Sequence, residues 1–210
     1  KTMETATHGL YLAGGITGRG SINGACYSGF LASQAIADTV PNESFPQIDE
    51  DQISREYERV MSFVRTKGEG PTSSQVKRLI RQTMWDKLGP IKNEHTMREG
   101  LARLNQIRAE IIPQMRLTTD TEIWNYELVD ALDAVDMLDY CELQFHCSLL
   151  RKESRGPFYR EDYPFIDNES WLKRTIVRLR DSKMDLFTRD VELKYVAPER
   201  KKVDYFTSDY

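Results

Sequence analysis

Apolar residues recur every three or four positions through the middle of the chain, the spacing of helices that bury one face. The Pro71-Thr72 start and the Gly89-Pro90 stop mark the two ends of one such segment. The segments with this spacing are residues 52–66, 71–88, 93–114 and 122–152. Four amphipathic helices joined by short polar turns predict an up-and-down helical bundle over residues 52–155.

The pattern changes after residue 155. Residues 175–180 and 184–196 alternate apolar and charged side chains, which is typical of half-buried antiparallel strands. The stretch Asp181-Ser182-Lys183 suits the hairpin turn between them. The last residues, 197–210, are polar and aromatic and predict an extended arm or a frayed tail. We therefore expect a small α+β subdomain over residues 156–210.

The N-terminal stretch has a third pattern, rich in glycine and other small residues. "GLYLAGG", residues 9–15, predicts a buried strand that enters a tight turn. Residues 21–40 predict a helix of small residues with Ser21 as its N-cap. Residues 41–51 hold two prolines and four acids and predict a linker. The fold class is therefore mainly α, with a strand-turn-helix piece at the start and a small antiparallel β subdomain at the end.

Composition narrows the class of protein. The chain has 210 residues, of which 29 are Lys or Arg and 33 are Asp or Glu, with a formal net charge of −4. This balance argues against nucleic-acid binding, which needs a basic face. No apolar run reaches the roughly 20 residues that span a bilayer, so direct membrane insertion is not expected. Three scattered cysteines suggest a reducing compartment, and we expect a cytoplasmic protein.

Other candidate chemistry is scarce. Cys141, His146 and Cys147 share one predicted helix, but their offsets do not place the side chains on one face. No second Cys/His pair accompanies them, so we predict no metal site. Trp85 and Trp124 are expected to anchor the core or an interface. No Ser/His/Asp set has a supporting context.

One long motif carries a family resemblance. The segment "ESRGPFYREDYPFIDNESWLKRT", residues 153–175, closely resembles the C-terminal region of succinate dehydrogenase/fumarate reductase flavoproteins. In that family a helical bundle ends in E-S-R-G, followed by R-E-D-Y/F-P and then W-L-K. The resemblance spans roughly residues 50–195. The matching residues are Glu153, Ser154, Arg155, Gly156, Arg160, Glu161, Asp162, Tyr163, Pro164, Trp171, Leu172, Lys173 and Arg174.

The N-terminal stretch resembles the last strand, turn and helix of the same family's FAD-binding domain. The resemblance implies FAD as the cofactor of the intact protein, held against a Gly-rich turn and a helix N-terminus. The positions carried over are Gly14, Gly15, Gly20, Ser21, Ile22 and Asn23. From the pattern alone, a plain strand-turn-helix packing unit is an equal alternative.

Two departures from the family concern the same loop. The family's acidic residue after A-G is Gly15 here, and the loop that follows is shorter than in the succinate/fumarate branch. Arg19 is its only cation and is the candidate for holding a substrate carboxylate; the alternative is a solvated loop residue. The branches that resemble L-aspartate oxidase and the adenylylsulfate reductase alpha subunit therefore stay open.

The resemblance implies an FAD-dependent oxidoreductase that passes a hydride between the flavin and a small acid. Electrons would be relayed to an iron–sulfur partner or a quinone. A Rossmann-like half and a capping domain are absent from these 210 residues, so the chain is expected to be a fragment, or a subunit that completes a partner. It is not expected to catalyse alone. An attachment at the inner face of the membrane would come only through such a partner.

In that interpretation, residues 153–174 form a clasp. Its charges pair across the joint between the bundle and the flavin domain, and Tyr159, Tyr163 and Trp171 pack that joint. The alternative to the FAD-dependent oxidoreductase is a non-catalytic helical-bundle module, or an accessory subunit that docks a partner through its amphipathic faces.

Overall fold

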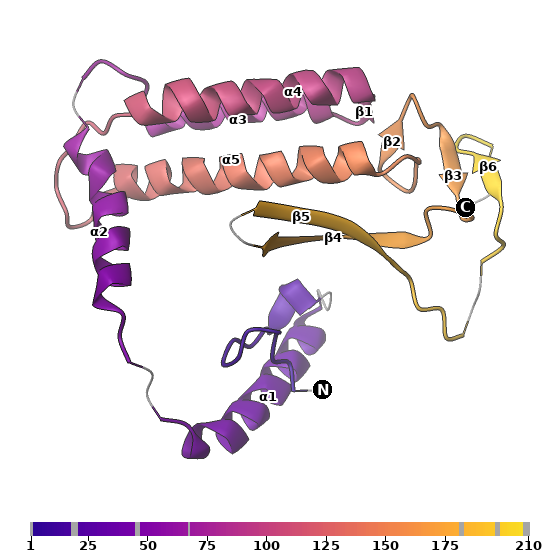
Figure 1. Ribbon diagram of the computed structural model, residues 1–210, viewed down its shortest axis with the longest axis horizontal. Helices are drawn as coiled ribbons and strands as arrows, with labels where there is room; N and C mark the ends of the chain where they lie inside the picture. The colour runs from indigo at the N-terminus through magenta and orange to yellow at the C-terminus, as the bar shows by residue number, and fades with distance from the viewer. Residues whose placement is uncertain are drawn as a thin grey trace. The chain divides into compact units, whose positions relative to one another are not determined.

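A computed structural model describes residues 2–17, 21–44, 47–66, 68–180, 183–195 and 198–207 (Figure 1). The chain forms two compact units, Lys1–Gln52 and Ile53–Tyr210. The first unit holds helix α1, Ile22–Thr39, and the second holds most of α2, Glu50–Arg65. The rest of the second unit consists of the helices α3, Ser73–Leu88, α4, Glu94–Gln106, and α5, Tyr126–Leu150, with six short strands.

Helices α3, α4 and α5 lie side by side and enclose the main core, as expected for a bundle (Figure 1). Val76 and Ile80 of α3 are fully buried, and Phe145 of α5 is buried beside Gly100 of α4. The other members of this core are Met97, Leu104, Ile107, Met115, Ala131, Ala134, Leu138 and Cys141. Close helix packing of this kind is what the 3.6-residue apolar stripes predict.

Each bundle helix begins at a residue whose side chain caps it. Thr72 accepts a hydrogen bond from the Gln75 N–H, and the Gln75 side chain accepts one from the Thr72 N–H, so the two form a capping box. Asn93 begins α4 in the same way, and Asn125 accepts from Leu128 N–H at the start of α5. These local signals explain why three helix starts fall close to their predicted positions.

The predicted helix 93–114 does not stay regular to its end. α4 stops at Gln106, and a π turn at Ile107–Ile111 and a 3-10 turn at Ile112–Gln114 follow it. In a regular helix the ring of Pro113 would clash with the carbonyl group of Ala109. The wider π turn relieves that clash while Ile107 stays buried.

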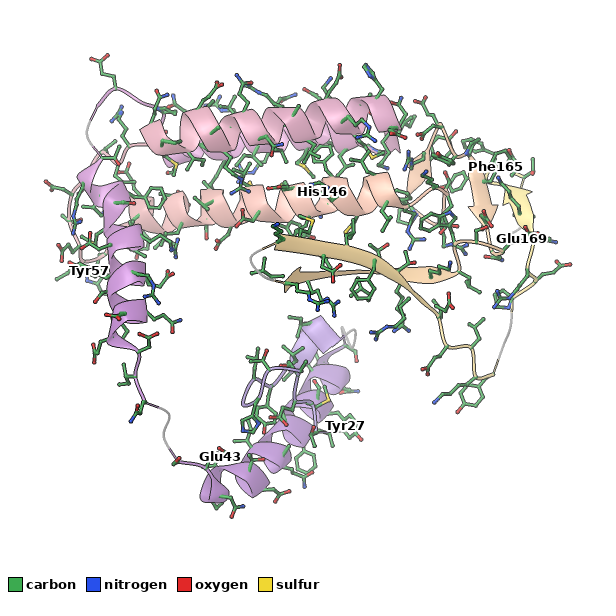
Figure 2. The ribbon with its side chains drawn as sticks, in the orientation of Figure 1. Tyr27, Glu43, Tyr57, His146, Phe165 and Glu169 are labelled. Atoms are coloured by element: carbon green, nitrogen blue, oxygen red, sulfur yellow. The ribbon has the colours of Figure 1, made fainter. Side chains whose placement is uncertain are left out.

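Side-chain burial differs from expectation at several positions. Trp85 and Trp124 are 73% and 83% exposed, so neither anchors the core, and their alternative role at an interface stays a prediction. Trp124 also has a left-handed backbone, φ +58, which a helix does not allow. The long helix α5 therefore begins at Tyr126 and not at the predicted residue 122. In α2, only the second half packs on the bundle, where Met61 and Val64 are buried. Ile53 and Tyr57 of its first half are exposed (Figure 2).

The described C-terminal residues form two pairs of strands among themselves and one pair with a strand that lies between α3 and α4 along the chain. β4, Lys173–Arg180, and β5, Lys183–Asp190, form the expected antiparallel hairpin, although β5 ends before the predicted residue 196. Asp181 and Ser182 of the expected turn lie outside the described residues. β1, Ile91–Lys92, pairs in parallel with β2, Tyr159–Arg160.

The chain's tail folds back as an extended arm on the second unit. Its strand β6, Lys202–Asp204, pairs antiparallel with β3, Phe165–Asp167 (Figure 1). The Tyr205 hydroxyl donates a hydrogen bond to the carbonyl oxygen of Gly156 at 2.6 Å. The rings of Tyr159, Tyr205 and Phe206 then pack in tilted and edge-to-face contacts, with centroids 5.0–5.2 Å apart. Polar and aromatic residues at the tail are therefore used to fix it in place.

The N-terminal stretch is not the predicted buried strand. Leu10 is 52% exposed, and one isolated bridge, Glu4 with Tyr11, is the only strand-like pairing among the described residues of this stretch. The Leu12 N–H donates to the Met3 carbonyl oxygen at 3.0 Å, which closes a small local loop. A strand needs the backbone of neighbouring strands, and the described residues of this unit supply none beyond residues 3–5.

Candidate functional site

The glycine turn and the helix that follows it are joined by one serine. The 3-10 turn Gly14–Thr17 begins at Gly14, whose φ of +81 favours glycine. The Gly14 N–H donates to the Ser28 hydroxyl at 2.9 Å, and this hydroxyl donates to the Ala25 carbonyl oxygen at 2.9 Å. Ser28 is fully buried. The turn is therefore held against α1 rather than left as an open loop.

The N-terminus of α1 is capped but still presents donors. Ser21 has an extended backbone and accepts a hydrogen bond from the Gly24 N–H at 3.0 Å, so its predicted role as N-cap is confirmed. The first N–H groups of any helix have no partner within it, and the first turn of α1 contains no acid. Eighteen aligned peptide dipoles therefore end in a positive pole at Ile22 and Asn23.

The predicted cofactor residues divide into two sets. Gly14 and Gly15 lie in the turn, and Ser21, Ile22 and Asn23 lie at the start of α1. Gly20 and the candidate substrate ligand Arg19 lie outside the described residues. A Cβ atom added at Gly15 would meet nothing within 4 Å, so the outer side of the turn is open. An open turn beside a positive helix pole fits the polar or anionic edge of a flat ring.

A second polar centre lies at the other end of the chain, around Arg160. Its side chain is fully buried at the end of α5. Nη1 donates to three carbonyl oxygens of that helix end, those of Ser148, Leu149 and Arg151, at 2.8–3.1 Å. The guanidinium thus satisfies carbonyl groups that a helix C-terminus leaves without partners, and its charge complements the negative helix pole.

Asp162 extends this contact to another helix. Arg160 Nε and Nη2 donate to its two carboxylate oxygens at 2.9 and 2.5 Å. The backbone N–H of Glu94, at the start of α4, donates to Asp162 Oδ2 at 3.0 Å. Burial acts to raise the pKa of Asp162, but the hydrogen bonds from Arg160 and Glu94 and the charge of Arg160 hold it below its usual value.

Glu153 is the second buried charge of this centre. Its side chain is 0% exposed and pairs with both Arg151 and Arg155. It also accepts a hydrogen bond from the backbone N–H of Asp167 at 3.2 Å. These ion pairs, like that of Arg160, are made within the unit Ile53–Tyr210. Glu153 and Arg160 therefore have ion-pair partners inside this unit, and the expected pairing across a joint to a flavin domain stays a prediction.

Comparison with known proteins decides the family. The family model described as "Fumarate reductase flavoprotein C-term" matches residues 77–204, more than half of the chain. The chain belongs to this family. Its family motif therefore coincides with the buried charge centre at Glu153, Arg160 and Asp162.

Relatives and solved structures agree with this membership. The chain is 26% identical over 149 residues to the succinate dehydrogenase flavoprotein subunit of Rickettsia conorii, covering 71% of this chain and 24% of that protein. It is 27% identical over 185 residues to an uncharacterized FAD-dependent oxidoreductase of Methanocaldococcus jannaschii, covering 83% of this chain and 32% of that protein. The chain thus spans about a quarter to a third of these relatives.

The fold also matches solved structures. Mycobacterium smegmatis Sdh1 in complex with UQ1 superposes with a TM-score of 0.75 at 24% identity, covering 91% of this chain and 34% of that one. A mutated E. coli quinol fumarate reductase FrdA superposes with a TM-score of 0.73 at 22% identity, covering 84% and 31%. These likenesses establish the fold of this flavoprotein family member.

Sequence reasoning missed two parts of these centres. Ser28 was read as one more small residue of the helix, and only its distance to Gly14 shows that it fastens the turn. The second is Lys92, whose ammonium donates to the carbonyl oxygen of Tyr159, next to Arg160, at 3.2 Å. Lys92 is only 6% exposed, and a single lysine in the sequence gives no sign of such burial. Among the described residues, no three His, Cys, Asp or Glu side chains cluster as metal ligands, and no helix could cross a membrane.

Proposed function

We propose that the chain is the C-terminal part of an FAD-dependent oxidoreductase that acts on a small carboxylic acid. The observation that carries the proposal is the turn at Gly14, which Ser28 holds beside the open N-terminus of α1. Membership of a flavoprotein family supports FAD as the group that would bind there. A bound flavin would supply hydride transfer to or from the acid.

The residues of this chain would bind and polarise the ring edge. The N–H groups at Ile22 and Asn23 and the positive pole of α1 would stabilise negative charge on the reduced flavin, an effect worth about 0.3–1 kcal/mol at an exposed helix end. Gly15 would let the backbone approach the ring closely, because no side chain stands in the way. Arg19 is proposed to hold the substrate's carboxylate.

Each part of the chain is proposed to have its own place in the intact protein. Residues 1–40 would complete an FAD-binding domain, 41–51 would be its linker, 52–155 the bundle and 156–210 the small C-terminal subdomain. The groups that bind the ADP portion of FAD, and the capping domain, are proposed to lie in parts of the protein outside these 210 residues. An iron–sulfur subunit would take or give the electrons, and it would hold an otherwise cytoplasmic enzyme at the inner face of the membrane.

The alternative is a non-catalytic module or accessory subunit that docks a partner. The exposed apolar residues of α1, Ile22, Tyr27 and Phe30, suit a covering partner under either proposal (Figure 2). Flavin dependence separates the two. The enzyme needs the start of α1 to line a flavin, whereas a docking module does not.

The test is the flavin content of the full-length protein carrying Asn23→Trp. An indole at the second position of α1 would fill the space in front of the helix pole, so the flavin-to-protein ratio should fall at least about tenfold. Gln34→Trp is the matched control, because it places the same ring on an exposed position of the same helix. An unchanged ratio in Asn23→Trp, or a wild-type protein that binds no flavin, would favour the docking module.

A further inference from the structure

A hollow of about 580 Å³ lies between α3 and α5, next to β1. Its volume falls within the roughly 300–1,000 Å³ of small-molecule sites. The lining is mostly apolar and includes Ile80, Met84, Leu88, Met137 and Cys141. It lies in the bundle and shares no lining residue with the glycine turn or α1. It shares only Pro157 with the family motif at residues 153–175 and no residue with the proposed flavin site.

Two exposed aromatic side chains stand at this hollow. Trp85 projects from α3 and is 73% exposed, and Tyr140 projects from α5 and is 62% exposed. Both residues belong to the lining of the hollow. Aromatic rings on two neighbouring helices form a suitable clamp for a flat or bulky apolar group.

Lys92 supplies a charge to this hollow. It lies in β1 and lines the hollow, yet the whole residue is only 6% exposed. Its ammonium donates to the carbonyl oxygens of Pro90 and Tyr159 at 3.1 and 3.2 Å and lies 4.7 Å from the centre of the Phe158 ring. Within the described part of the chain it forms no ion pair with a carboxylate.

A buried cation without a counter-ion is costly. Burial, together with the nearby charge of Arg160, lowers the pKa of Lys92. An acid that reached this ammonium would remove that cost. The described residues of the lining also include a second cation, Arg81, and no Asp or Glu. The charge of the hollow is therefore complementary to an anion.

We propose that this hollow binds a small amphipathic anion. Its carboxylate, sulfonate or phosphate would pair with Lys92, and its apolar body would lie between Trp85 and Tyr140. Gln144 offers an amide for a further hydrogen bond. A small ligand suits the hollow because its volume of about 580 Å³ is in the range of small-molecule sites.

The test uses two dyes of nearly the same shape with the full-length protein. Anilinonaphthalene sulfonate is an aromatic anion, and N-phenylnaphthylamine is its neutral counterpart. Isothermal titration should find one anion-dye site that Trp85→Ala weakens at least about tenfold, as expected for loss of an aromatic anchor. Trp124→Ala is the matched control, since Trp124 is also largely exposed but does not line the hollow.

The role of the Lys92 charge in binding the anion is tested with separate variants. Lys92→Met should weaken the sulfonate dye about tenfold and leave the neutral dye unchanged, whereas Lys92→Arg should keep both. Equal weakening of both dyes by Lys92→Met, or no effect of Trp85→Ala on the anion, would overturn the proposal. If Lys92→Met loses its helical circular dichroism, Trp85→Ala and Tyr140→Ala decide, because both positions are exposed and their truncation leaves the core intact.

Discussion

The guanidinium of Arg160 and the carboxylate of Asp162 form a bidentate ion pair that joins the ends of two helices. Arg160 holds the carbonyl end of α5, and Asp162 accepts from the N–H of Glu94 at the start of α4. Each charge thus faces the helix pole of opposite sign. The pair occupies the R-E-D stretch of the family motif, so the motif is explained by the way two helix ends meet.

Arg160→Met should destabilise the protein by about 3 kcal/mol, the scale of breaking a buried pair from one side. Three carbonyl groups of α5 would lose their donor and Asp162 its partner. Arg178→Met is the control, because the Arg178–Asp185 pair is exposed and is worth at most about 1 kcal/mol. Calorimetry on both variants measures the difference. Equal shifts in the two unfolding midpoints would contradict the buried pair's role.

Gly100→Ala should destabilise the bundle, although alanine normally favours a helix by about 1 kcal/mol. A Cβ atom at Gly100 would lie 2.4 Å from Phe145 Cζ and 2.7 Å from Lys87 Cβ. Since Phe145 is fully buried, the overpacking should cost about 1–3 kcal/mol. Asn105→Ala, exposed on the same helix, is the control and should be neutral or slightly stabilising. Chemical denaturation tests both, and a stabilised Gly100→Ala would refute the close approach of α4 and α5.

Ser28→Ala should loosen the glycine turn. The Gly14 N–H would lose its hydrogen bond to the hydroxyl, a loss of about 0.5–1.5 kcal/mol. Amide exchange of residues 14–17 should accelerate, and flavin retention should fall if the proposed site is correct. Ser33→Ala is the matched control, because the Ser33 hydroxyl bonds to the carbonyl of Phe30 on the exposed side of the same helix. Unchanged exchange at the turn in Ser28→Ala would show that other contacts hold it.

The N-terminal loop should depend on pH through His8. Its Nε2 lies 3.0 Å from Glu43 Oε1, and its Nδ1 lies 3.0 Å from Glu4 Oε1. The hydrogen bond to Glu43, then the charges of Glu43 and Glu4, raise the pKa of His8 above 6.5. Because the folded pKa is raised, this stabilisation is fully present below pH 6.5 and is lost as the pH rises through the folded value.

Hydrogen exchange of residues 2–12, corrected for its intrinsic pH dependence, measures this effect. Protection should fall as the pH rises above 6.5 in the wild type and stay flat in His8→Gln, which cannot become charged. If protection in the wild type were as independent of pH as in His8→Gln, the His8 imidazole would not hold the loop through Glu43.

The sequence alone was enough for features that depend on neighbours along the chain. Helix periodicity and the caps at Ser21 and Thr72 are set within a few residues, because an N-cap hydrogen bond spans only two or three positions. The motif at residues 153–175 was enough to recognise the family, which the match to residues 77–204 confirmed. The two strands of the β4–β5 hairpin were also foreseen, from alternation alone.

Features that join distant residues were decided only by the tertiary structure. The contact of Asp162 with Glu94 spans 68 positions, and no local pattern encodes it. The buried residues of α5 are Ala131, Ala134, Leu138, Cys141 and Phe145. Three of these five are small residues, which a search for large apolar side chains does not find. Burial likewise depends on what the rest of the molecule covers. Leu10 is therefore exposed although its pattern is that of a buried strand, and Lys92 is buried although lysine is usually exposed.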